Sequence, residues 1–279
     1  MHAKLIFFDI DGTLAMPGYS PSKAVTEAIR AARKAGHKVF ISTGRVKQDV
    51  PEAIHSIGFD GGIYSAGGYI EADGNVLFHQ VMQPEMIHRI AAALCCEGMC
   101  YCLESPEGNF KGRNQTSSLL HTDLSNAASE LRRFVLQNFL GEGGKTADHY
   151  TDEPVYKITF LSPDLDSIDR LQEQIGHLAK IVRFDNLSGD FPFICGEISD
   201  FSINKGAALQ KICSHYDMTC SECIAFGDSM NDAEILETAG LGIAMGNSEP
   251  VILEIAEMVC DRCENDGVAK ALSKLQLFP

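Results

Sequence analysis

The chain has 279 residues, 45% of them hydrophobic and 22% charged, which permits one large folded unit or two modest ones. Its formal net charge of −15 argues against a nucleic-acid partner, because an acidic surface repels polyanions. The first apolar run stops at Asp9, and no later segment approaches the roughly 18 apolar residues of a membrane span. We therefore expect a cytoplasmic protein that binds neither nucleic acid nor membrane; the sequence carries no signal for its oligomeric state.

The amino-terminal part of the chain alternates between strands and helices. Short apolar runs predict strands at 4–9, 39–42 and 61–65, with helices at 20–36 and 49–57 between them. This alternation implies right-handed crossovers and a parallel sheet.

The pattern changes at about residue 83 and returns at about residue 199. The middle part predicts helices at 84–97, 123–139 and 165–179, and strands at 98–104, 109–115, 155–161, 181–186 and 191–194, with a hairpin turn at Ser188-Gly189-Asp190. The last part predicts helices at 205–216, 233–239 and 267–275, and strands at 223–226, 241–244 and 258–260. We therefore expect an α/β protein: a Rossmann-like doubly wound parallel sheet (1–82 and 190–279) with an inserted α+β domain (83–189).

Two acidic residues follow the first strand. Asp9 and Asp11, in Asp9-Ile10-Asp11-Gly12-Thr13-Leu14, lie where open α/β sheets bind their ligands, at the carboxyl ends of the strands. Like charges this close raise each other's pKa unless they share a cation. Hard oxygen ligands with room for a phosphate favour Mg²⁺. The pattern Asp-x-Asp-Gly is also common in solvated turns, so the interpretation needs support elsewhere.

Three later segments supply that support. Ser42-Thr43-Gly44-Arg45 ends the second strand with a hydroxyl, a glycine and a cation, which suit a phosphate. Lys205 opens a helix, where its charge opposes the helix dipole unless an anion lies nearby. Asp228 follows another strand, and Asp232 lies one helical turn further on. Acidic residues at two strand ends of one parallel sheet predict a site for a metal and a phosphate.

In this order and spacing, the four segments resemble the four motifs of the haloacid dehalogenase (HAD) superfamily. The short stretch between Leu14 and Pro21, and the large insertion between the second and third motifs, resemble its Cof-type subfamily IIB, in which the inserted domain is a C2B-type cap. Ala244–Asn247 and Asp266–Ala269 extend the resemblance nearly to the end of the chain. The resemblance implies a Mg²⁺-dependent phosphatase that hydrolyses phosphate monoesters of small metabolites, such as sugar phosphates, nucleotides or cofactor phosphates, through an aspartyl-phosphate.

The resemblance also implies roles for individual residues. Asp9 is expected to be the nucleophile, and Asp11 the acid and base. The expected Mg²⁺ ligands are Asp9, the backbone carbonyl of Asp11, Asp228 and, through water, Asp232. Thr43 and the catalytic Lys205 are expected to bind the phosphoryl oxygens, with Gly44 and Asn231 supporting them. Arg45 is a candidate phosphate or substrate contact from its place in the second motif, where an exposed surface charge is the alternative.

Several positions depart from this pattern or stand outside it. Ser65-Ala66-Gly67-Gly68 occurs where relatives usually have Asn-Gly-Ala, which puts substrate contacts near the cap hinge in doubt. Lys111, Arg113 and Lys157 are candidate substrate contacts, although exposed surface charges are the favoured interpretation of each. No catalytic role is expected of three histidines, His121, His149 and His177.

Two cysteine pairs have the spacing of zinc ligands, Cys220-x-x-Cys223 and Cys260-x-x-Cys263. The first pair lies at the amino end of its predicted strand and the second at the carboxyl end of one, so a strand of about five residues at ~3.3 Å each separates them. We therefore expect packed thiols instead of a zinc site.

Two other functions are compatible with the motifs. A phosphomutase would return the phosphoryl group to a second hydroxyl, and a non-catalytic protein would only bind a phosphometabolite. The joint presence of Asp9, Asp11, Lys205 and Asp228 favours catalysis over binding alone.

Overall fold

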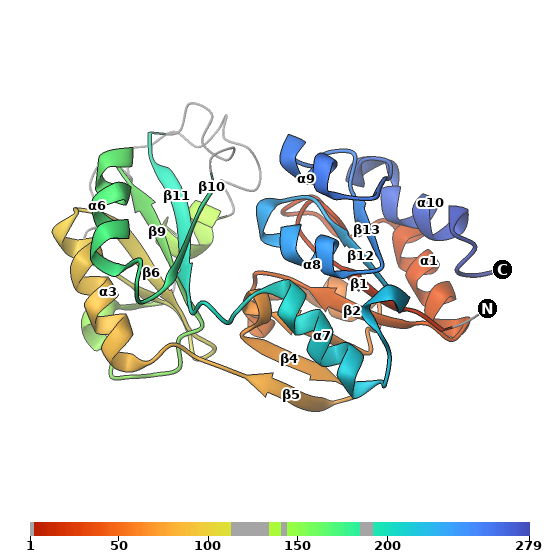
Figure 1. Ribbon diagram of the computed structural model, residues 1–279, viewed down its shortest axis with the longest axis horizontal. Helices are drawn as coiled ribbons and strands as arrows, with labels where there is room; N and C mark the ends of the chain where they lie inside the picture. Colours follow the sequence, from red (N-terminus) through yellow and green to blue (C-terminus); the bar gives the residue numbers. More distant parts are fainter. Residues whose placement is uncertain (1–2, 113–133, 141–143, 185–191) are drawn as a thin grey trace. The chain divides into compact units, whose positions relative to one another are not determined.

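The computed structural model describes residues 3–112, 134–140, 144–184 and 192–279. The chain divides into two compact units: unit 1 comprises Met1–His79 and Ser202–Pro279, and unit 2 is the stretch Gln80–Phe201 inserted between them. In Figure 1 the red amino-terminal and blue carboxyl-terminal segments lie in one sheet of unit 1. Both ends of the chain are therefore needed to build that sheet.

Unit 1 is built on an eight-stranded sheet in the order β14-β13-β12-β1-β2-β3-β4-β5. The pairs from β14 to β3 are parallel, and β4 and β5 add an antiparallel hairpin at one edge. The strands are β1 (Leu5–Phe8), β2 (Lys38–Ser42), β3 (Gly61–Tyr64), β4 (Tyr69–Ala72), β5 (Asn75–His79), β12 (Cys223–Gly227), β13 (Leu241–Ala244) and β14 (Met258–Val259). Since β1 lies between β12 and β2, Asp9 leaves the sheet near its centre.

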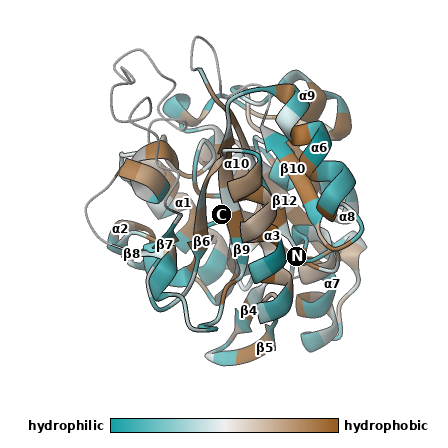
Figure 2. Ribbon diagram, turned by 90° about the vertical axis from the view of Figure 1, so that its left-hand side faces the viewer, coloured by the Kyte–Doolittle hydropathy of each residue, from teal (hydrophilic) through white to brown (hydrophobic). Residues whose placement is uncertain are grey.

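Helices cover both faces of this sheet, as the doubly wound prediction requires. The helices of unit 1 are α1 (Lys23–Lys34), α2 (Glu52–His55), α7 (Lys205–His215), α8 (Ala233–Thr238), α9 (Pro250–Ile255) and α10 (Gly267–Lys274). The buried side chains of α1 and α10 join one core cluster with β1, and those of α7, α8 and α9 join another on the opposite face. Figure 2 shows hydrophobic and hydrophilic residues on the same helices, as expected when one side of a helix packs on a sheet.

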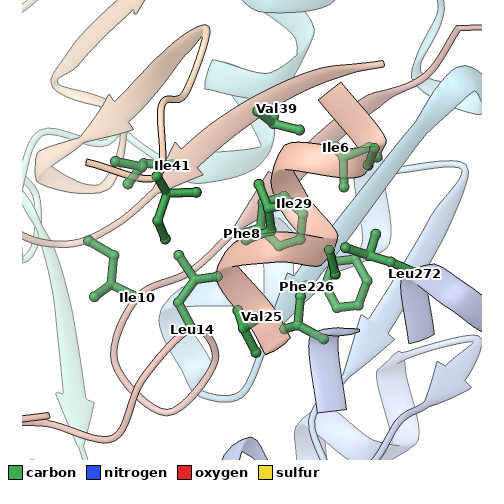
Figure 3. Packing of buried hydrophobic residues seen from close by; sticks show 14 of the residues in the cluster. Ile6, Phe8, Ile10, Leu14, Val25, Ile29, Val39, Ile41, Phe226 and Leu272 are labelled. Atoms are coloured by element: carbon green, nitrogen blue, oxygen red, sulfur yellow. The ribbon is translucent and has the colours of Figure 1, made fainter. Parts of the chain in front are cut away.

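The sequence of α1 explains why it forms where it does. Ser22 caps its amino terminus by accepting a hydrogen bond from the Val25 N–H, and the buried residues recur at Val25, Ala28, Ile29 and Ala32. Figure 3 shows Val25 and Ile29 packed over Phe8. The Phe8 ring also stacks on Phe226, with centroids 5.1 Å apart. Burial of such a side chain contributes about 1.5–3 kcal/mol, so this cluster fixes β1, and the residues that follow it, against α1.

Unit 2 contains a six-stranded sheet in the order β10-β11-β9-β6-β7-β8, antiparallel except for β7 and β8. Its strands are β6 (Cys100–Glu104), β7 (Phe110–Lys111), β8 (Lys145–Thr146), β9 (Lys157–Ser162), β10 (Lys180–Phe184) and β11 (Ile194–Ser199). Its helices are α3 (Pro84–Cys96) and α6 (Leu165–Ile175). Both helices share a core cluster with one face of the sheet, while alternate strand residues point to the other face. The predicted fold class, an α/β core with an inserted α+β domain, is confirmed.

Short helical turns complete the chain. The 3₁₀ turns are η1 (Lys47–Asp49), η2 (Ser65–Gly67), η4 (Ala147–His149), η6 (Cys220–Glu222), η7 (Met230–Asp232) and η8 (Cys263–Asn265), and η3 (Leu136–Leu140) is a π-helical turn. Within the described residues, the structure contains no helix that is long and apolar enough to cross a membrane.

The unit boundaries differ from the predicted ones at 82/83 and 189/190. β11 pairs with both β9 and β10, so the residues up to Phe201 belong to unit 2, and unit 1 resumes at Ser202. The predicted helix at 49–57 is shortened to α2, because Pro51 stands before it in extended conformation. The hairpin β4–β5 was not predicted. The predicted turn at 188–190, residues 123–133 of a predicted helix, Arg113 and His121 lie outside the described residues.

Candidate active site

The side chains of the site come from the ends of parallel strands and from the start of one helix. Asp9 follows β1, Thr43 follows β2 and Asp228 follows β12, while Lys205 is the first residue of α7. Parallel strands present their carboxyl ends at one edge of a sheet, so these residues meet in unit 1 although up to 219 positions separate them, from Asp9 to Asp228. All four are buried.

Lys205 is the centre of a hydrogen-bonded network. Its Nζ lies 2.9 Å from Asp9 Oδ1, 2.5 Å from Asp232 Oδ1 and 3.2 Å from Asn231 Oδ1. Asn204 caps α7 by accepting from the Ala207 N–H, so the helix begins at the lysine itself. The anions beside Lys205 resolve the conflict between its charge and the helix dipole.

Burial and charge shift the pKa values of this network. Burial raises the pKa of Asp9 to about 8, against the lowering effect of Lys205. Burial by itself would lower the pKa of Lys205, but Asp232 and Asp9 raise it above its ordinary value. Lys205 is therefore a fixed cation, while Asp9 needs further positive charge nearby to be ionised at neutral pH.

Asp228 is packed against the loop that follows Asp9. Thr13 Oγ1 donates to Asp228 Oδ1 over 2.9 Å. Gly12 has a φ of +86°, and a Cβ at this position would lie only 2.2 Å from Asp228 Oδ2. Only glycine fits both the backbone conformation and this close approach. The glycine of the first motif therefore brings the two acidic segments together.

Asp9, Asp228 and Asp232 form a cluster that suits a divalent cation. One carboxylate oxygen from each lies within 4.8 Å of the others, and among the described residues this is the one such group of three potential ligands. Three carboxylates opposed by Lys205 leave an excess of two negative charges when all are ionised. Oxygen donors with this excess charge fit a hard divalent cation.

Within that cluster, Asp232 has structural partners as well. Its Oδ2 accepts from the backbone N–H groups of Asp228 and Ser229, at 3.0 and 3.3 Å, while Oδ1 accepts from Lys205. It is completely buried. Asp232 therefore shapes the loop that carries Asp228 and holds the lysine in place.

Arg45 is engaged by Asp11. Its Nε and Nη2 donate to the two carboxylate oxygens of Asp11 over 2.7 and 2.6 Å, and its Nη1 donates to the Asp49 carbonyl. A guanidinium with these partners serves to hold the Asp11 carboxylate. The structure therefore gives no support to the prediction that Arg45 contacts phosphate.

The other predicted phosphate contacts have different surroundings. Thr43 Oγ1 accepts from the Arg45 N–H at 3.1 Å, and its own hydroxyl hydrogen is left to donate. Asn231 Oδ1 accepts from Lys205 and from the Ser229 hydroxyl, so Asn231 supports the lysine. Gly44, between Thr43 and Arg45, is partly exposed.

Two supporting features were missed in the sequence. Asn247 Nδ2 donates to the Gly12 carbonyl at 2.9 Å, and its Oδ1 accepts from the Cys263 N–H, which ties the loop after Asp9 to the end of the chain. The turn Ser65–Gly67 has three successive positive φ values, and its N–H groups donate to the carbonyls of Arg45 and Thr43. Only Gly67 tolerates a positive φ without cost, so Ser65 and Ala66 hold a strained backbone that the sequence alone does not reveal.

The remaining candidates lie in unit 2 or on cysteines. Lys157 was favoured as an exposed surface charge, and this is wrong: it is 4% exposed and pairs with Glu104 and Glu197. Lys111 lies on β7 and is half-buried. His149 is hydrogen-bonded to Thr146, and His177 is exposed.

Comparisons with known proteins identify the family of the chain. A family model described as haloacid dehalogenase-like hydrolase matches residues 6–272. The HMP-PP phosphatase of Yersinia pestis is 28% identical, and the match covers 96% of this chain and 94% of that protein. A haloacid dehalogenase-like hydrolase structure from B. subtilis is 26% identical with a TM-score of 0.77, covering 98% of this chain and 99% of that one. A HAD subclass IIB sugar phosphatase shares the fold at 22% identity, with a TM-score of 0.77 and coverage of 99% and 100%. This chain belongs to the haloacid dehalogenase-like hydrolase family, whose model matches nearly its whole length.

Proposed function

We propose that Asp9 is the nucleophile of a Mg²⁺-dependent hydrolysis of small phosphate monoesters. The observation that carries this proposal is the position of Asp9: a buried carboxylate at a strand end, 2.9 Å from a fixed cation and beside two more carboxylates. A nucleophilic carboxylate must approach a phosphate dianion, and a close charge pair costs about 4 kcal/mol at an effective dielectric of ~20. Positive charge held in the site offsets that repulsion.

The proposed reaction has two steps on this chain's own residues. An oxygen of Asp9 attacks phosphorus and forms an acyl phosphate, while Asp11 donates a proton to the departing alkoxide. Water then attacks the same phosphorus, Asp11 takes its proton, and inorganic phosphate leaves Asp9 as a free carboxylate. Lys205 and the Thr43 hydroxyl bind the phosphoryl oxygens as charge develops on them.

The expected ligands of Mg²⁺ are the carboxylates of Asp9 and Asp228 and the backbone carbonyl of Asp11, with Asp232 behind them. When bound, the cation supplies charge neutralisation of the ionised Asp9 and the phosphoryl oxygens. Asp232 is expected to act mainly through Lys205 and the Asp228 loop, because its oxygens already accept three hydrogen bonds.

The pair formed by Asp11 and Arg45 must open before Asp11 acts as an acid. Two hydrogen bonds from Arg45 hold Asp11 as a carboxylate. Proton donation requires Asp11 to be protonated and turned toward the leaving oxygen. In the proposed mechanism, the Asp11–Arg45 pair is therefore the arrangement that precedes proton donation.

The substrate class rests on the relatives. The relatives named HMP-PP phosphatase and sugar phosphatase act on small phosphorylated metabolites. We accordingly propose a small phosphometabolite as substrate, and a panel of HMP-PP, sugar phosphates, nucleotides and cofactor phosphates as the means to identify it.

Replacement of the nucleophile tests the mechanism directly. Asp9→Asn keeps the size of the side chain but removes its nucleophilic charge, so phosphate release is expected to fall by at least about 10⁴-fold. Asp169→Asn is the matched control, since Asp169 is exposed on α6, and it should turn over at the wild-type rate. Circular dichroism should show that both variants are folded. Turnover retained in a folded Asp9→Asn variant would refute the assignment.

The metal is tested by removal and return. Chelation should abolish turnover of the wild-type protein, and added Mg²⁺ should restore it more fully than Ca²⁺, which takes more ligands and a looser geometry. Activity that survives exhaustive chelation would exclude the proposed cofactor.

The phosphomutase alternative makes a different prediction on the same panel. A phosphatase releases phosphate from a simple aryl phosphate with no second substrate. A mutase depends on a sugar bisphosphate and returns the phosphoryl group to a hydroxyl. Inertness toward every ester on the panel would favour a binding protein.

A further inference from the structure

Three cysteines of unit 1, Cys213, Cys220 and Cys223, lie where α7 ends and β12 begins. The candidate active site is at the opposite ends of these two elements. Cys213 lies on the last turns of α7, and Cys223 is the first residue of β12. Their sulfur atoms are 3.2 Å apart, and both residues are buried. Cys220, in the turn η6 between them, is partly exposed and interacts with Cys213. The cluster was not predicted, because the sequence pairs Cys220 with Cys223 and hides the contribution of Cys213.

The two close thiols differ in their ionisation. Either sulfur can donate in the hydrogen bond between them, and when Cys223 donates, this bond lowers the pKa of Cys213 below its ordinary value. The same bond, together with burial, raises the pKa of Cys223. Cys213 is therefore the member of the pair that ionises first, and the thiolate is the form of cysteine that reacts with oxidants.

The geometry favours a bond between these sulfurs. A disulfide has a sulfur–sulfur distance of about 2.05 Å, so the atoms need to approach by only about 1.2 Å from their separation of 3.2 Å. All ten cysteines of the chain are free thiols in this structure. Cys213 and Cys223 are thus two free thiols whose sulfur atoms already lie close together.

We propose that Cys213 and Cys223 form a peroxide-reactive thiol pair that closes to a reversible disulfide. The Cys213 thiolate attacks one oxygen of a hydroperoxide, the oxygen–oxygen bond breaks, and the leaving oxygen takes a proton and departs as water or alcohol. Cys213 is now a sulfenic acid. The Cys223 sulfur attacks the Cys213 sulfur, and the hydroxyl leaves as water with the Cys223 proton. Two thiols lose two electrons and the peroxide gains them; a dithiol reductant reverses the change.

This chemistry is separate from that of the phosphatase site. Lys205 lies eight residues before Cys213 on α7, about 12 Å along the helix axis at 1.5 Å per residue. Asp228 lies beyond the opposite end of β12 from Cys223. The proposal therefore does not depend on the proposed mechanism of hydrolysis, and an inactive Asp9→Asn protein should form the same disulfide.

Peptide mapping tests the proposal on the full-length protein. The protein is treated with hydrogen peroxide, alkylated without reductant, and digested with trypsin and a protease that cleaves after acidic residues. Asp217 and Glu222 then separate the peptides of Cys213, Cys220 and Cys223. We expect a linked peptide that joins Cys213 to Cys223 and disappears after treatment with dithiothreitol.

Three variants make the assignment specific. Cys223→Ser should lose the linked peptide and accumulate a Cys213 sulfenic acid that dimedone traps. Cys213→Ser should lose both signals. Cys220→Ser is the matched control and should keep the link between Cys213 and Cys223. A link from Cys213 to Cys220, irreversible oxidation of Cys213 without a link, or full alkylation of all three thiols after peroxide would each overturn the proposal, and the wild-type map gives this answer even if a variant fails to fold.

Discussion

Each unit of the molecule buries a lysine between two carboxylates, but the two clusters lie at different places in their sheets. In unit 1, Lys205 opens a helix beside strand ends and reaches Asp9 and Asp232. In unit 2, Lys157 begins β9, and its partners Glu104 and Glu197 lie on the neighbouring strands β6 and β11. The same three charges thus build a strand-end site in one unit and a clamp across three strands in the other.

The difference shows that a buried charge alone does not identify a catalytic centre. The unit 1 cluster has a third carboxylate, Asp228, and the larger excess of negative charge is a reason to expect a cation there. The unit 2 cluster instead follows the register of an antiparallel sheet, where cross-strand pairs stabilise the fold. Placement at the carboxyl ends of parallel strands is the feature that separates a site from a structural ion pair.

Lys205→Met should have the largest effect on turnover. The substitution removes the cation that binds Asp9 and, in the proposed mechanism, the phosphoryl oxygens, so we expect kcat to fall about 10³-fold. Steady-state phosphate release measures this loss. Lys211→Met, on the same helix, is the control and should change kcat by less than about twofold, because its lysine contacts only the Phe78 ring in the described interactions. Equal losses in both variants would mean that α7 as a whole had been disturbed.

Lys157→Met should act mainly on stability. Removal of the lysine leaves the buried Glu104 and the half-buried Glu197 without this partner, and breaking a buried pair costs about 3–5 kcal/mol. Hydrogen exchange at the amides of β9 and β11 measures the loss locally. The exposed Lys145→Met is the comparison, expected to cost at most about 1 kcal/mol. If the Lys157→Met protein had wild-type hydrogen exchange but no turnover, Lys157 would be needed for activity and not for stability.

His37 is a buried ionisable group that, within the part of the chain the structure describes, has no carboxylate among its hydrogen-bond partners. Its replacement should have the smallest effect of the three. Burial lowers the pKa of His37, and its Nδ1 accepts from the Lys4 N–H, which fixes the neutral form. A lowered folded-state pKa means that the unfolded chain binds the proton more readily. His37 therefore contributes stability above the ordinary histidine pKa of about 6.5, and this is lost as the pH falls below it. The urea midpoints of unfolding should be measured for wild type and His37→Gln at pH 7.5, 6.5 and 5.5. The difference between the two midpoints should shrink as the pH falls; a difference that stays constant with pH would contradict the assignment.

The sequence predicted the elements that local patterns determine. The alternation of apolar runs gave the order of strands and helices in unit 1, and the strand-end motifs gave Asp9, Thr43, Asp228 and the helix-opening Lys205. These succeed because one edge of a parallel sheet collects the carboxyl ends of its strands, whatever the distance along the chain.

Features that depend on contacts between distant side chains were not predictable in this way. The pairing of Arg45 with Asp11 joins residues on different loops, and the burial of Lys157 follows from strands whose partners are 40 or more positions away. The boundary at Ser202 follows from the pairing of β11, which a run of five or six residues does not reveal. The tie from Asn247 to Gly12 likewise spans 235 positions.

Because unit 2 is inserted into unit 1, the sheet of unit 2 can be completed before that of unit 1 while the chain is being synthesised. Every strand of the unit 2 sheet lies between Cys100 and Ser199, so this sheet is encoded in one continuous stretch. β1, by contrast, lacks its neighbour β12 until residue 227 has been made. A nascent chain therefore carries Asp9 through the translation of the whole insertion before Lys205 and Asp228 exist, and the proposed active site is assembled only near the end of translation.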